Sequence, residues 1–136
     1  MTYNEQLMTK EGVIMTLQEL YTLIDGNYEQ AQKIMKMDKL IDRYIRKLKT
    51  SGVYEQMTAA GEKMDPVGLF ESAHAMKGVC ANLGLDDLAA MAEIITEEFR
   101  PGKSRCMSDE AVKEKLAEID KLYRKTLDGI ERYENE

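Results

Sequence analysis

The sequence contains a single histidine, His74, and the residues that follow it suit phosphoryl chemistry. Lys77 lies three positions later and Gly78 four positions later, so on a helix both would lie beside His74 on one face. The ordinary pKa of histidine, about 6.5, leaves the imidazole largely neutral at neutral pH, and a neutral ring nitrogen can attack a phosphoryl group. A nearby lysine can offset the charge of the phosphoryl oxygens. This combination favours a carrier of phosphoryl groups.

The helix that must position these residues has recognisable ends. Asp65 suits the cap, Pro66 suits the first helical position, and Gly84 suits a C-terminal stop. Between them, apolar residues repeat every three or four positions and predict one buried stripe. Its members are Leu69, Ala73, Met76, Cys80 and Leu83. His74 falls well round from this stripe, so we expect its ring to face solvent, with Phe70 at the border.

Each member of the combination also has an ordinary interpretation. A lone surface histidine usually has no role, and a lone lysine is most often a solvated charge. Glycine inside a helix costs about 1 kcal/mol relative to alanine, so Gly78 needs a reason. That reason is close approach, either by a neighbouring helix or by the active site of a partner. The combination of all three is far more specific than its parts.

The pattern His74-x-x-Lys77-Gly78, followed by Leu83-Gly84, resembles the signature of histidine-containing phosphotransfer (HPt) domains. Two residues depart from it: alanine stands at position 75, where Ser or Thr is common, and methionine at position 76, where Leu is common. Neither change touches the reactive groups. The resemblance covers roughly residues 15–134, and its flanks are weaker than the motif itself.

The resemblance implies a function and a set of roles. His74 would accept a phosphoryl group on Nε2 from a phospho-aspartate of one receiver domain and pass it to another, with Lys77 steadying the phosphoryl oxygens. Phe70, Gly78 and Ala81 would form the docking patch. The implied partners are receiver domains of response regulators and of hybrid sensor histidine kinases. The chain would be a carrier rather than an enzyme, with no cofactor, ATP site or metal of its own.

The periodicity of the whole chain predicts an all-α fold, which agrees with the resemblance. We expect an antiparallel four-helix bundle with helices at 38–62 (broken near Gly52), 65–83, 86–99 and 108–133, and additional short N-terminal helices capping one end. No segment has convincing strand alternation. Residues 1–14 are predicted to form a tail or a short helix, and residues 15–134 a single HPt-like domain.

Composition excludes several classes of function. The net charge of −6 argues against non-specific binding of nucleic acid, which needs a basic surface. No apolar run approaches the length of a membrane span, and the N-terminus lacks the pattern of a secretory signal. Two cysteines do not make a disulfide framework. We therefore expect a cytoplasmic monomer with reduced thiols.

Patterns typical of other kinds of site also occur in the sequence, but each is incomplete. Residues 101–104 end like a phosphate-binding loop, but Glu97 stands where the first glycine is required. Glu71-x-x-His74 has di-iron spacing, but such sites need two inward-facing motifs. A zinc site from His74, Cys80 and Cys106 lacks any usual spacing. The main alternative is a helical adaptor that binds a signalling partner without phosphorylation, and a metal-binding bundle is a distant third.

Overall fold

The structure is a computed structural model that describes residues 8–9, 12–13 and 15–135. Its helices are α1 (Leu17–Leu23), α2 (Tyr28–Met35), α3 (Asp38–Lys47), a 3₁₀ turn η2 (Leu48–Thr50), α4 (Val53–Lys63), α5 (Pro66–Asn82), α6 (Asp86–Glu98) and α7 (Asp109–Asn135). Two short antiparallel strands, β1 (Met8–Thr9) and β2 (Gly12–Val13), precede them. Most of the predicted segment 1–14 lies outside the described residues.

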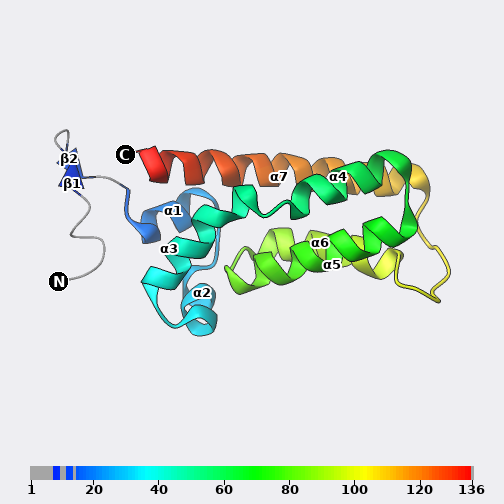
Figure 1. The fold of residues 1–136 in the computed structure, drawn as a ribbon, viewed down its shortest axis with the longest axis horizontal. Helices are drawn as coiled ribbons and strands as arrows, with labels where there is room; N and C mark the ends of the chain where they lie inside the picture. The colour runs from blue at the N-terminus through cyan, green and yellow to red at the C-terminus, as the bar shows by residue number, and fades with distance from the viewer. Residues whose placement is uncertain (1–7, 10–11, 14, 136) are drawn as a thin grey trace.

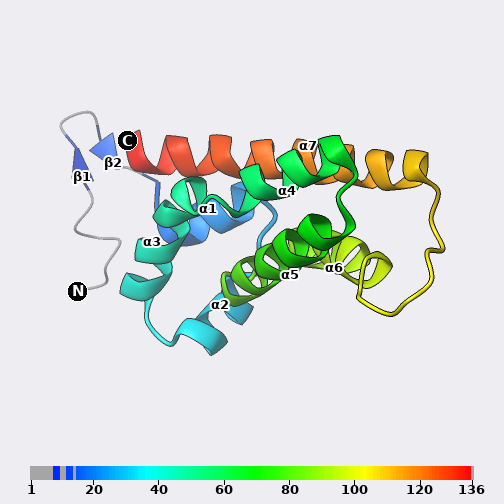
Figure 2. The same cartoon turned by 45° about the vertical axis from the view of Figure 1, so that its right-hand side comes forward.

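The prediction of an all-α antiparallel bundle is confirmed. Helix α4 runs beside α7 in the opposite direction, and α3 is steeply inclined to α7 (Figure 1). Helices α5 and α6 form an antiparallel hairpin against α4 and α7. The short helices α1 and α2 lie at the end of the bundle that holds the α5–α6 turn (Figure 2). The helix predicted over 38–62 is broken near Gly52, as expected, because this glycine takes a left-handed φ of 79° between η2 and α4.

Helix α5 has the ends and the buried stripe that the sequence predicts. Pro66 occupies its first turn after Asp65, and Leu69, Ala73, Met76, Cys80 and Leu83 are all buried in one continuous core. Gly84 follows with a φ of 69°. A Cβ at Gly84 would overlap the backbone oxygen of Asn27, so only glycine permits this approach. The Gly84 carbonyl accepts a hydrogen bond of 2.7 Å from the Asn27 N–H, which fixes the α5–α6 turn against the start of α2.

A buried carboxylate organises the connection between α6 and α7. Glu98 is only 3% exposed. It accepts hydrogen bonds from the guanidinium of Arg105 at 2.8 Å and from the backbone N–H groups of Cys106 and Met107 at 3.0 and 2.8 Å. Lys103 lies 3.6 Å from its second oxygen. The loop is thus held to the end of α6 by one side chain.

Within the part of the chain that the structure describes, none of the helices is both long enough and apolar enough to cross a membrane.

Candidate functional site

His74 lies in the middle of α5 with its ring exposed, as predicted. The Phe70 ring, one turn earlier, stacks on the imidazole with 5.7 Å between ring centroids and an interplanar angle of 9°. This stack is an i,i+4 contact along a single helix. Phe70 therefore restricts the directions in which the imidazole can point, a role that the sequence analysis did not assign to it.

A cation from the α6–α7 connection approaches the same stack. The guanidinium of Arg100 lies 5.5 Å from the Phe70 ring centroid, and its Nε donates a hydrogen bond of 2.5 Å to Glu97. Arg100 lies in sequence well beyond α5, so this contact depends on the α5–α6 hairpin. It joins the start of the loop to the helix that carries the histidine.

Lys77 lies beside His74 on α5, but its ammonium is not simply solvated. It forms an ion pair with Glu93 of α6. The Lys77 and Glu93 side chains are 39% and 34% exposed, so the pair lies at the protein surface. The sequence predicts that Lys77 is a cation directed at the histidine. The structure adds a competing carboxylate from the neighbouring helix.

The face of α5 around Gly78 is open. A Cβ added to Gly78 would meet no heavy atom of the described residues within 4 Å. Two other glycines inside helices behave differently, because a Cβ at Gly61 would lie 2.7 Å from Leu116, and one at Gly129 would overlap Ile24. Close packing inside the protein therefore explains Gly61 and Gly129 but not Gly78. Ala81, on the same face, is half-buried and presents only a methyl group.

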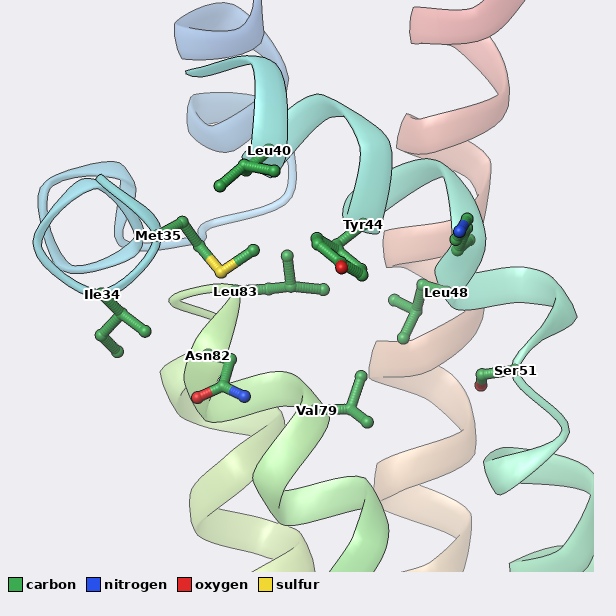
Figure 3. A pocket seen from close by; sticks show the side chains of 10 residues that line it. Ile34, Met35, Leu40, Tyr44, Leu48, Ser51, Val79, Asn82 and Leu83 are labelled. Atoms are coloured by element: carbon green, nitrogen blue, oxygen red, sulfur yellow. The ribbon is translucent and has the colours of Figure 1, made fainter. Parts of the chain in front are cut away.

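An apolar groove of about 560 Å³ adjoins this face, between α2, α3 and α5. Figure 3 shows Met35, Tyr44 and Val79 pointing into it from the three helices. Its lining comprises Ile34, Met35, Leu40, Tyr44, Lys47, Leu48, Ser51, Val79, Asn82 and Leu83. The sequence pattern alone did not predict this groove. A signal for the groove was present in α2 and α3, which carry more apolar residues than the core can bury. Ile34 remains 39% exposed and Tyr44 44% exposed.

The residues considered for metal binding are not brought together. Among the described residues, no group of three or more His, Cys, Asp or Glu side chains could hold a metal ion. Cys80 is buried in the core, and burial raises the pKa of its thiol to about 12. Cys106 is exposed in the α6–α7 loop. The structure therefore lends no support to a site built from His74 and the two cysteines.

Comparison with protein families identifies the family of the chain. Residues 13–129 match the family described as Hpt domain, and the chain belongs to this family. No curated protein and no solved structure matches it. Hpt domains are phosphohistidine carriers that interact with receiver domains in phosphorelays, and they are not classical enzymes. The resemblance inferred from the sequence is thereby confirmed.

Proposed function

We propose that His74 is the phosphoryl acceptor and donor of this chain, and that it relays phosphoryl groups between receiver-domain aspartates. The observation that carries this proposal is an exposed imidazole on α5, oriented by Phe70 and followed by the open surface at Gly78. A reacting nitrogen on a convex helix must enter the active site of another protein. The chain's own part is to present the nitrogen in a fixed direction.

The proposed transfer needs little from the chain beyond that presentation. The unprotonated Nε2 of His74 attacks phosphorus, the bond between phosphorus and the aspartate oxygen breaks, and the carboxylate leaves with the electron pair. Transfer to the next receiver reverses these bond changes. Phosphoryl transfer depends mainly on positioning and on stabilisation of the oxygens' charge. Lys77 would offset part of the charge on the phosphoryl oxygens while the group is held on His74.

Docking of a receiver domain would use the surface around Gly78 together with Phe70 and Ala81. The absence of a side chain at Gly78 lets another backbone approach α5 closely. The groove between α2, α3 and α5 extends this surface with exposed apolar side chains such as Ile34 and Tyr44, which a partner could cover. Exposed apolar patches of this kind commonly mark sites of protein interaction.

The test is phosphoryl transfer from a panel of phosphorylated receiver domains, measured as a gain in intact mass. The wild-type chain should gain one phosphoryl group that is lost in mild acid, whereas the His74→Gln variant should gain none. Because His74 is exposed, this substitution should change the free energy of unfolding by no more than about 0.5 kcal/mol. An acid-stable adduct, or an equal gain in His74→Gln, would contradict the proposal.

The alternative is the adaptor that binds a signalling partner without phosphorylation. It predicts that a receiver domain binds wild type and His74→Gln with equal affinity while neither gains mass. The open surface at Gly78 suits both functions, whereas an exposed imidazole oriented by Phe70 favours the carrier. A cytoplasmic location and a monomeric state remain predictions.

A further inference from the structure

The ion pair between Lys77 and Glu93 links the histidine helix to its neighbour α6. Lys77 is three residues from His74 on α5, and the flexible stem of a lysine can reach a group on a side chain one turn away. The same ammonium therefore has two anions within reach once His74 carries a phosphoryl group. These are the Glu93 carboxylate and the phosphoryl oxygens.

The exposure of the pair makes an exchange between these anions feasible. Both side chains are more than a third exposed, and exposed ion pairs of this kind change an equilibrium by only about 1.5- to 5-fold. A phosphoryl group carries roughly 1.5 to 2 negative charges at neutral pH, against one for a carboxylate. The phosphoryl group can therefore attract Lys77 away from Glu93, but only against the competition of this carboxylate.

We propose that Lys77 exchanges between Glu93 and the phosphoryl group on His74, and that Glu93 thereby shortens the lifetime of the phosphohistidine. The inference rests on the proposed function of His74 and adds a regulator of it. Glu93 is a positioning residue, since it acts only through Lys77. A carrier that holds its phosphoryl group less firmly releases it more readily to the next receiver.

The direction of the effect follows from the bond changes in hydrolysis. A water oxygen bonds to phosphorus, the bond between phosphorus and nitrogen breaks, and the imidazole leaves and takes up a proton. The transition state is loose, so the phosphoryl oxygens lose negative charge as the bond breaks. A cation near these oxygens therefore stabilises the phosphohistidine more than the transition state, and it slows hydrolysis of the bond between phosphorus and nitrogen. Freeing Lys77 from Glu93 should therefore prolong the lifetime.

The experiment needs no receiver domain, because phosphoramidate can load the histidine directly. The imidazole nitrogen attacks phosphorus, and ammonia leaves with the proton. The half-life of the phosphorylated protein is then followed by intact mass at one neutral pH. The variants are Glu93→Gln, Lys77→Gln and the double variant. Asp87→Asn is the control, because it removes the same charge from an exposed position of α6 that lines a hollow with residues of α7.

We expect Glu93→Gln to lengthen the half-life about 2- to 5-fold and Lys77→Gln to shorten it. In the Lys77→Gln background, Glu93→Gln should have no further effect. Equal lengthening by Asp87→Asn, or an effect of Glu93→Gln that persists without Lys77, would show a general charge effect and overturn the inference. If wild type is loaded but Glu93→Gln decays at the same rate, only the inference fails. If neither phosphoramidate nor any receiver loads wild type, both fail.

Discussion

At the scale of single residues, the glycine at position 78 is explained by docking and not by folding. Its missing side chain gives the folded chain no packing benefit, because a Cβ there would meet none of the described atoms within 4 Å. Glycine nevertheless weakens the helix, since its backbone loses more freedom on folding than that of alanine. A residue that lowers helix stability without improving internal packing is best explained by what must approach it from outside.

We therefore predict that Gly78→Ala raises the free energy of unfolding by about 1 kcal/mol, as measured by urea denaturation. Gly129→Ala is the matched control within a helix, and it should be destabilising because its Cβ would overlap Ile24. A bulky side chain in Gly78→Leu should leave loading by phosphoramidate intact and slow transfer from receiver domains. Unchanged transfer in Gly78→Leu would contradict the docking role.

At the scale of elements, the connection between α6 and α7 depends on Glu98. Burial raises the pKa of this carboxyl, but the backbone N–H groups of Met107 and Cys106 and the guanidinium of Arg105 outweigh burial and hold the pKa below its ordinary value of 4.5. A carboxyl with a lowered pKa stabilises the folded state above its unfolded pKa, and this contribution is lost as the pH falls through the folded value.

Glu98→Gln should accordingly lower the free energy of unfolding by about 1–3 kcal/mol at neutral pH, because it weakens several hydrogen bonds to a buried group. The difference from wild type should stay constant from neutral pH down to about 5 and shrink below 4.5. Urea titrations at a series of pH values measure this. Glu97→Gln, an exposed neighbour, should change stability by less than about 0.5 kcal/mol, and a similar loss there would argue against the role of Glu98.

The elements themselves were largely predictable, because their signals are local. The proline and glycine at the ends of α5, its buried stripe and the break at Gly52 all follow from backbone preferences and helical periodicity. The stack of Phe70 on His74 was also accessible in principle, since it is an i,i+4 contact. The pair between Lys77 and Glu93 was not, because it joins residues sixteen positions apart in facing helices. The groove needs three helices to form and has no signature in any one of them.

At the scale of the whole molecule, the end of α7 completes the bundle beyond the region that defines the family. The family match ends at residue 129, yet Ile130 and Tyr133 are fully buried. The Tyr133 hydroxyl donates a hydrogen bond of 2.5 Å to Asp42 of α3, and Glu134 forms an ion pair with Lys49 at 2.5 Å. The last turns of α7 thus attach α3 to the bundle.

A chain ending at residue 129 should therefore be less stable by about 3–5 kcal/mol, the usual loss when large buried side chains are removed. A chain ending at residue 134 should retain nearly the stability of the full chain. Urea denaturation of the two truncated chains compares them directly. Equal stability of both would show that the bundle is complete at residue 129, and it would contradict the predicted domain of residues 15–134.

The groove adjoins the exposed face of α5 because α2 and α3 meet this helix there. A partner that covered both surfaces would therefore depend on the arrangement of the whole molecule. Ile34 lies in the groove and is 39% exposed, whereas Ile94 lies on α6 outside the groove lining and is 42% exposed. The two side chains have the same chemistry and nearly the same exposure. A partner that docked on His74 and in the groove would cover Ile34 but not Ile94.

We predict that Ile34→Glu weakens binding of a transferring receiver domain by about tenfold or more, because a buried charge without a partner is costly at an interface. Ile94→Glu should change the affinity less than about twofold. Both variants should load from phosphoramidate at the wild-type rate, since neither residue contacts His74. Titration calorimetry with the receiver measures the affinities. Equal effects of the two substitutions would mean that partners do not enter the groove, and docking would then be confined to the surface around Gly78.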